Sequence, residues 1–158
     1  MLQIVPVDAR DDGRFTVWYS ALRAGATAGR HAPIVVSATA MRSQLLHQTR
    51  AVRHAVGAFD GDQCLGTAVL ERDTQDNTHL GELDVNVPPE YRRQGIGTLL
   101  LQQLLGIAAG VGLTTLLGEV NVVDETSPGL AFTVRHGFHS VHTENRLVLD
   151  LPAVTRAD

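Results

Sequence analysis

The stretch 85-VNVPPEYRRQGIGTLLLQQLL-105 joins the end of a strand-like run, a basic glycine-bearing turn and an apolar helix in direct succession. Pro88 and Pro89 end the strand-like run, because proline has no backbone N–H to donate to a neighbouring strand. Gly95 and Gly97 let the backbone of the turn approach a ligand without a Cβ in the way. The first turn of a helix leaves backbone N–H groups unpaired at the positive end of the helix dipole, so this junction is typical of an anion-binding site.

Two arginines, Arg92 and Arg93, precede these glycines and can pair with anionic oxygens through their guanidinium groups. A pyrophosphate is the natural ligand of such a turn. The dinucleotide pattern G-x-G-x-x-G requires glycine at position 100, where the chain has Leu100, so a Rossmann-type cofactor is disfavoured. The alternative without a ligand is a tight glycine-containing turn with solvated arginines.

Composition limits the class of protein. The chain has 158 residues, with 44% hydrophobic and 19% charged residues, which describe one globular domain rather than a disordered chain. A net charge of −4 disfavours nucleic acid as a partner, since nucleic-acid binders neutralise phosphates with basic residues. All 13 basic residues are arginine, which excludes Schiff-base chemistry and a Walker A lysine. No apolar run is long enough for a transmembrane helix and residues 1–14 do not resemble a signal peptide, so we expect a cytoplasmic protein without a membrane partner.

Cysteine and histidine give little support for thiol or metal chemistry. The single cysteine, Cys64, excludes an intramolecular disulfide framework and is interpreted as a small buried hydrophobe. His136, His139 and His142 lie close together in the sequence. Gly137 interrupts a helix there, and positions 139 and 142 face opposite sides of a strand. We therefore predict no metal site.

Hydrophobic periodicity predicts one continuous domain over residues 1–158 with the element order βααβββαβαββ, an α/β or α+β fold. Helices are expected within residues 11–30, 37–50 with Ser37 as N-cap, 96–109, and around 127–136. Strands are expected at 2–7, at 53–73 as two strands around the turn at Asp60-Gly61-Asp62, at 79–87, at 113–122 as a buried strand, and within 138–152 as closing strands.

The junction resembles the GCN5-related N-acetyltransferase (GNAT) superfamily, whose acyl-CoA-binding motif Q/R-x-x-G-x-G/A is met by Arg92-Arg93-Gln94-Gly95-Ile96-Gly97. A second stretch, 130-LAFTVRHGF-138, is similar to the aromatic helix and Gly-Phe ending of the family's last helix. The two matches mark an acyl-CoA-binding core over residues 80–138. The resemblance implies a GNAT-like mixed, mostly antiparallel central sheet flanked by helices.

By this resemblance, backbone amides of the turn hold the CoA pyrophosphate. A bulge in the fourth strand would free backbone groups for the pantetheine arm and the thioester carbonyl, and a backbone N–H near Val87 would stabilise the oxyanion, an effect typically worth about 3 kcal/mol. Ser127 and Phe132 would lie at the cofactor from the last helix, although capping with Pro128 at the first helical position also explains Ser127. The expected cofactor-binding residues are Val85, Asn86, Val87, Arg92, Arg93, Gln94, Gly95, Ile96, Gly97, Thr98, Ser127 and Phe132.

The attacking amine must lose a proton, and Glu82 and Asp84 project from the same face of the strand as Asn86. Glu82 is the first choice as general base, because similar acetyltransferases often carry a glutamate near this position. The alternative is that both carboxylates are only the polar face of a half-buried strand. The family's frequent tyrosine acid is replaced by Thr133, so Ser127, a water or unaided departure of the CoA thiolate would take its place.

The resemblance thus implies an N-acetyltransferase that moves an acetyl group from acetyl-CoA to a primary amine of a small molecule or peptide, by direct attack in a ternary complex. A homodimer is possible, since dimers are frequent in the family. The missing tyrosine raises the alternative of a noncatalytic acyl-CoA-binding or regulatory domain. A dehydrogenase-like nucleotide binder is a third reading, disfavoured by the missing third glycine.

Overall fold

The computed structural model describes residues 1–152, which fall into two compact units, Met1–Glu119 and the residues from Val120 onward. In chain order, the first unit contains β1 (Leu2–Pro6), α1 (Asp12–Thr27), α2 (Ala38–Leu46), β2 (Ala51–Asp60), β3 (Gln63–Asp73), β4 (Leu80–Asn86), the 3-10 helix η1 (Pro89–Tyr91), α3 (Ile96–Gly110) and β5 (Thr115–Gly118). The second unit contains α4 (Pro128–Arg135).

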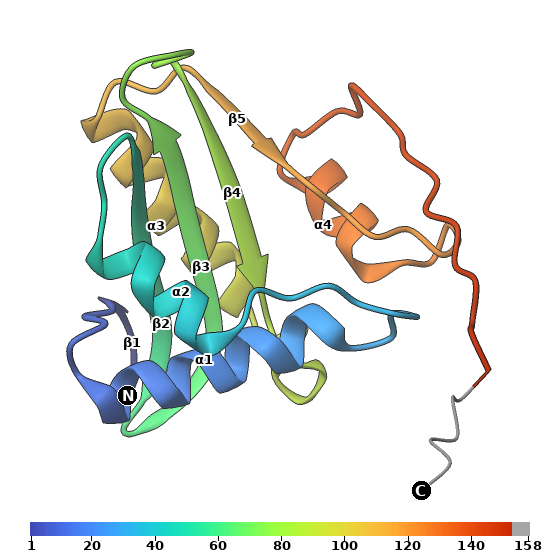
Figure 1. Ribbon diagram of the computed structural model, residues 1–158, viewed down its shortest axis with the longest axis horizontal. Helices are drawn as coiled ribbons and strands as arrows, with labels where there is room; N and C mark the ends of the chain where they lie inside the picture. The colour runs from blue at the N-terminus through green and yellow to red at the C-terminus, as the bar shows by residue number, and fades with distance from the viewer. Residues whose placement is uncertain (153–158) are drawn as a thin grey trace, which may run out of the picture. The chain divides into compact units, whose positions relative to one another are not determined.

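The five strands form one sheet in sequence order, β1-β2-β3-β4-β5 (Figure 1). The pairs β1–β2, β2–β3 and β3–β4 are antiparallel, and β4 and β5 run parallel. Helices α1 and α2 cover one face of the sheet and α3 covers the other (Figure 1). The predicted α/β fold, with a mostly antiparallel sheet flanked by helices, is confirmed.

Aromatic residues fill the core beneath α1. Trp18 is fully buried, and its Nε1–H donates to the carbonyl oxygen of Val56 at 2.9 Å. A Cβ on Gly57 would stand 3.0 Å from Trp18 Cδ1 and 2.5 Å from Phe59 Cε2, so the glycine makes room for both rings. Burial of a side chain such as Phe15 stabilises the fold by about 2 kcal/mol.

Helix α3 packs tightly on the opposite face of the sheet. Its buried residues recur at helical spacing, at Ile96, Leu100, Leu104 and Ala108. A Cβ on Gly66 of β3 would stand 2.8 Å from Ile96 Cγ2 and 2.9 Å from Leu100 Cδ1. The first two turns of α3 therefore rest directly on the backbone of β3, which fixes the position of the helix N-terminus.

Local features predicted from the sequence are confirmed. Ser37 Oγ accepts from the backbone N–H of Ala40 at 3.2 Å and caps α2, which ends earlier than expected, at Leu46. Gly61 has a φ of 59° in the turn between β2 and β3. Gly110 is the last residue of α3.

Two strand predictions are wrong. Of residues 113–122, only β5 is a strand, and it lies mostly exposed at the sheet edge rather than buried. Residues 138–152 form no strand in the described part of the chain, and Leu147 and Leu149 are 95% and 83% exposed. Alternating apolar residues show that a segment could pair, but a strand also needs a partner that is distant in sequence. No helix within residues 1–152 is long and apolar enough to cross a membrane.

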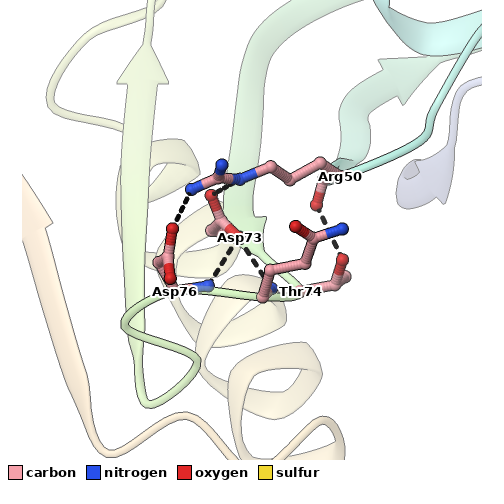
Figure 2. Close-up of polar contacts among 5 residues, drawn as sticks. Arg50, Asp73, Thr74 and Asp76 are labelled. Carbon is pink, nitrogen blue, oxygen red and sulfur yellow. Dashed lines mark hydrogen bonds and ion pairs between the residues drawn. The ribbon is translucent and has the colours of Figure 1, made fainter.

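Arg50, just before β2, binds the loop that follows β3 through hydrogen bonds and an ion pair (Figure 2). Its Nε donates to Asp73 Oδ2 at 2.6 Å, and a terminal guanidinium nitrogen pairs with Asp76. The Arg50 carbonyl oxygen accepts from both N and Oγ1 of Thr74 at 3.0 Å. Hydrogen bonds from the backbone N–H groups of Asp76 and Gln75, and then from Arg50, lower the pKa of Asp73 to about 2.

Candidate active site

The chain leaves β4 at Asn86 and reaches α3 through Val87, Pro88 and η1. Pro88 is buried and Pro89 starts η1, where the fixed φ of proline suits the first helical position. Arg92 Nε donates to the carbonyl oxygen of Val87 at 2.9 Å. Arg92 therefore links the end of β4 to the turn before α3 through a hydrogen bond, and it also places a positive charge in that turn.

The turn before α3 has the backbone geometry of an anion site. Gly95 is the N-cap residue of α3 and adopts the left-handed conformation, with a φ of 81°. A Cβ added there would meet no atom within 4 Å, and no side chain caps the helix. No capping side chain therefore competes with a ligand for the N–H groups of the first turn, and the helix dipole adds typically about 0.3–1 kcal/mol per bound negative charge. These features fit a pyrophosphate.

The other residues of the turn surround this helix N-terminus. Arg93, with a φ of 63°, and Gln94 are exposed on the outside of the turn. Ile96 is 2% exposed and anchors the start of α3 in the core, whereas Gly97 and Thr98 are half-buried. The structure thus brings the predicted pyrophosphate residues 92–98 together at one place.

Val85, Asn86 and Val87 lie where β4 loses its partner on one side. Strand β5 pairs with β4 only from Leu80 to Leu83 in the described residues, because β5 has just 4 residues. Strand β3 pairs with β4 through Asn86 without a register shift, so the bulge expected in this strand is wrong. The register shift lies between β2 and β3 instead, at Ala58 and Phe59. The early end of β5, rather than a bulge, leaves this part of β4 at a sheet edge.

Strand β4 presents its polar side chains on the face of the sheet that α1 covers. Glu82 and Asp84 are exposed, and Asn86 is 6% exposed. Leu83 and Val85 point the other way and pack against the α3 side of the core. Asn86 Nδ2 donates to Asp84 Oδ2 at 2.8 Å.

Glu71 of β3 lies opposite Glu82 in the β3–β4 register, which sequence reasoning did not identify. Its Oε2 pairs with Arg53 Nε at 2.7 Å, across the neighbouring strand pair. Residues directly opposite on antiparallel strands lie on the same face. The face that carries the two candidate bases therefore holds a third carboxylate, whose charge Arg53 already balances.

Gly25 of α1 packs against the end of β4, and sequence reasoning missed this residue too. A Cβ on Gly25 would stand 3.0 Å from both Asn86 Cβ and the Val87 backbone nitrogen, and 3.1 Å from the Asn86 carbonyl carbon. Any larger residue at position 25 would require α1 or the end of β4 to move by a few tenths of an ångström. The sequence did contain a signal for this contact, because a glycine inside a predicted helix costs about 1 kcal/mol of stability relative to alanine. Such a glycine usually has a packing or functional role.

The second unit carries Ser127 and Phe132. Ser127 is the N-cap residue of α4, and Pro128 follows it at the start of the helix, as predicted, but the Ser127 side chain makes no capping hydrogen bond. Its Oγ accepts instead from the backbone N–H groups of Val123 and Asp124, at 2.9 and 3.2 Å. The centroid of the Phe132 ring lies 4.5 Å from the centroid of the His136 ring. Thr133, at the position of the family's tyrosine, donates its hydroxyl to the Leu130 carbonyl oxygen at 2.9 Å.

Neither a metal cluster nor a reactive thiol is found in the described chain. No group of three or more His, Cys, Asp or Glu side chains in residues 1–152 is arranged to hold a metal ion. Cys64 is buried, and burial is the main cause that raises its pKa to about 11. Its thiol donates to the Gly66 carbonyl oxygen at 3.3 Å.

The Acetyltransferase (GNAT) family matches residues 24–138 of this chain. The chain therefore belongs to the GNAT acetyltransferase family, and its fold is that of a GNAT-type N-acetyltransferase. Members of this family take the acyl group from acyl-CoA, which agrees with the anion site before α3. The match spans both compact units, and no curated protein sequence matches the chain.

Solved acetyltransferase structures share this fold. An aminoglycoside acetyltransferase from an uncultured soil metagenomic sample, in complex with sisomicin, superposes with a TM-score of 0.69 at 17% identity, covering 96% of this chain and 97% of that chain. A ribosomal-protein-alanine N-acetyltransferase from Brucella melitensis biovar Abortus 2308 gives a TM-score of 0.66 at 19% identity, covering 96% and 99%. A tandem GNAT protein from the clavulanic acid biosynthesis pathway gives 0.69 at 25% identity, covering 87% of this chain and 43% of that chain.

Proposed function

We propose that this protein transfers an acetyl group from acetyl-CoA to a primary amine, by direct attack of the amine on the thioester in a ternary complex. The observation that carries the proposal is the uncapped N-terminus of α3, opened by left-handed Gly95 and joined to the end of β4 through Arg92. This arrangement offers an anion site for the CoA pyrophosphate beside a polar strand face for the acceptor.

Each part of the site has a distinct task in this proposal. The amides of residues 95–98, with Arg93, would hold the pyrophosphate, and Val85 to Val87 would line the pantetheine arm. A backbone N–H near Val87 would stabilise the oxyanion as the amine attacks. Glu82 or Asp84 would accept the proton of the amine. Ser127 and Phe132 are further proposed cofactor contacts.

The acceptor is proposed to be a small-molecule or peptide amine. Structural neighbours include an aminoglycoside acetyltransferase and a ribosomal-protein-alanine N-acetyltransferase, which represent these two acceptor classes. Glu82 and Asp84 make the strand face acidic, since Arg53 balances only the charge of Glu71, and this favours a cationic amine over an anionic acceptor. The cytoplasmic location, the homodimer, the single-domain organisation and the lack of nucleic-acid and membrane partners stay predictions from the sequence.

Calorimetric titration with acetyl-CoA, with NADH as the control ligand, tests the cofactor. Release of free CoA is then followed with a panel of acceptors: sisomicin, spermidine and a peptide with an N-terminal alanine. We expect micromolar binding of acetyl-CoA, no binding of NADH, and thiol release that depends on at least one amine. Absence of acetyl-CoA binding by folded protein would refute the proposed role of residues 92–98.

A noncatalytic acyl-CoA-binding domain is the second candidate. It is favoured by Thr133, which occupies the tyrosine position and uses its hydroxyl within α4. The titration separates the two candidates, because this domain would bind acetyl-CoA tightly and release no CoA with any amine of the panel.

A further inference from the structure

Asn86 is a buried polar residue at the point where β4 meets the turn. It is one of three buried polar residues in the part of the chain that the structure describes, together with Thr67 and Ser127. A buried amide costs free energy unless it is hydrogen-bonded. Asn86 Nδ2 donates to the exposed carboxylate of Asp84 at 2.8 Å, a hydrogen bond to an ionised acceptor, which is stronger than a neutral one.

The surroundings of Asn86 restrict its side chain. From α1, Gly25 approaches so closely that a Cβ there would stand 3.0 Å from Asn86 Cβ. From β3, Thr67 lies directly opposite Asn86 and is 0% exposed. An amide packed between a helix and a strand loses little further rotamer entropy when it binds the carboxylate. Asp84 therefore has a fixed partner inside the core.

Glu82 has a different environment on the same face. It lies opposite Glu71, so its neighbour across the strands is another carboxylate. Along a strand, which rises about 3.3 Å per residue, Asp84 is roughly 10 Å from Val87 and Glu82 is roughly 16 Å away. Asp84 Oδ2 also leans toward the Val87 end of the strand, because it binds Asn86. Of the two carboxylates, Asp84 is both nearer to the proposed oxyanion site and better held.

We propose that Asn86 is a positioning residue that holds the Asp84 carboxylate as the proton acceptor of acetyl transfer. This inference rests on the function proposed above and assigns the proton to Asp84 rather than Glu82. The amine nitrogen forms a bond to the thioester carbonyl carbon, and the carbon–sulfur bond breaks with its electron pair remaining on the CoA sulfur. The amine proton passes to the Asp84 carboxylate, directly or through a water, and is then released to the CoA thiolate or to solvent. The products are the N-acetyl amine and CoA.

A double-mutant cycle separates positioning from a merely structural role. Asp84→Asn is expected to lower kcat by about 10²–10⁴-fold, the usual cost of losing a general base, with the Kd for acetyl-CoA changed less than twofold. Asn86→Leu is expected to lower kcat by about tenfold. The kcat of the double variant should be no lower than that of Asp84→Asn, because the Asn86 side chain acts on the chemical step only through that carboxylate. Thr16→Val is the control, since Thr16 lies in the exposed first turns of α1, where its hydroxyl donates to the Asp12 carbonyl oxygen at 2.7 Å, and its loss should leave kcat unchanged.

Two outcomes overturn the inference while leaving the proposed function intact. Losses for Asp84→Asn and Asn86→Leu that multiply in the double variant would show that Asn86 acts independently of Asp84. A loss for Glu82→Gln that equals or exceeds the loss for Asp84→Asn would make Glu82 the proton acceptor, and this comparison remains valid if Asn86→Leu fails to fold, because both carboxylates are exposed. A folded wild-type protein that binds acetyl-CoA and acetylates no amine would instead refute the proposed function, and the inference with it.

Discussion

Replacing Gly25 by alanine should slow acetyl transfer more than it changes stability. The new Cβ would stand 3.0 Å from the Val87 nitrogen and 3.0 Å from Asn86 Cβ, closer than ordinary contacts, so α1 or the end of β4 must move by a few tenths of an ångström. The alanine gains about 1 kcal/mol in helix propensity, and overpacking costs about 1–3 kcal/mol. The net change in the free energy of unfolding is therefore a loss of roughly 0–2 kcal/mol, with Tm falling by no more than about 8 °C.

Catalysis should respond more strongly, because the displaced atoms belong to the proposed oxyanion site. A misplacement of about 1 Å in a catalytic group can cost 10²-fold, so a shift of a few tenths of an ångström predicts a loss in kcat of roughly tenfold. The Kd for acetyl-CoA should change little, since the proposed anion site lies at α3. Steady-state kinetics, calorimetric titration and thermal denaturation measure the three quantities.

Gly106→Ala provides the control, because Gly106 lies within α3 and an added Cβ would meet no atom within 4 Å. It should raise stability by about 1 kcal/mol through helix propensity alone and leave kcat unchanged. If Gly25→Ala also stabilised the protein by about 1 kcal/mol and kept the wild-type kcat, α1 would not constrain the end of β4 and the packing argument would fail.

Three further predictions concern the turn, the loop after β3 and the thiol. Gly95→Ala places a Cβ on a residue with a φ of 81°, which should destabilise the fold by about 1–2 kcal/mol and weaken acetyl-CoA binding about tenfold; an unchanged Kd in the calorimeter would contradict the anion site. Because the pKa of Asp73 is lowered to about 2 in the folded protein, its ionised carboxylate stabilises the fold above pH 4, and this stabilisation should be lost as the pH falls from about 4 to about 2. In urea titrations over this pH range, the free energy of unfolding should fall less steeply with pH for Asp73→Asn than for the wild type. Equal pH slopes for the two proteins would contradict the role of the Arg50 network. Cys64, with its pKa raised to about 11, should react with a disulfide reagent at pH 8 only after denaturation, and rapid labelling of the native protein would disprove its burial.

Features set by neighbours in sequence could be predicted from the sequence. The N-cap at Ser37 and the turn at Gly61 each depend on backbone preferences of one or two residues. The placement of residues 92–98 around one helix N-terminus followed from the same local reasoning. The alternation along β4 likewise placed Glu82, Asp84 and Asn86 on one face, because strand side chains have a period of two.

Features that depend on long-range pairing were predicted less well. The length of β5 and the missing strands in residues 138–152 are set by the availability of a partner strand, which hydrophobic alternation does not specify. The expected bulge in β4 was wrong for the same reason, since register is a property of two strands. Glu71 and Gly25 were missed because their importance arises only when β3 and α1 are placed against β4.

The two halves of the proposed site are held by separate close contacts, and a glycine lies at each contact. Gly66 lets Ile96 and Leu100 rest on β3, which fixes the N-terminus of α3. Gly25 lets α1 rest on the end of β4, which fixes Asn86 and Val87. Arg92 links the halves through its hydrogen bond to the Val87 carbonyl oxygen. In the proposed site, a cofactor whose pyrophosphate binds at the α3 turn brings its thioester to the carboxylates of β4 only if both halves keep their spacing. Close packing at these two glycines would therefore hold the cofactor half and the proton-transfer half at a fixed distance, and substitutions in one half should perturb cofactor binding and proton transfer separately.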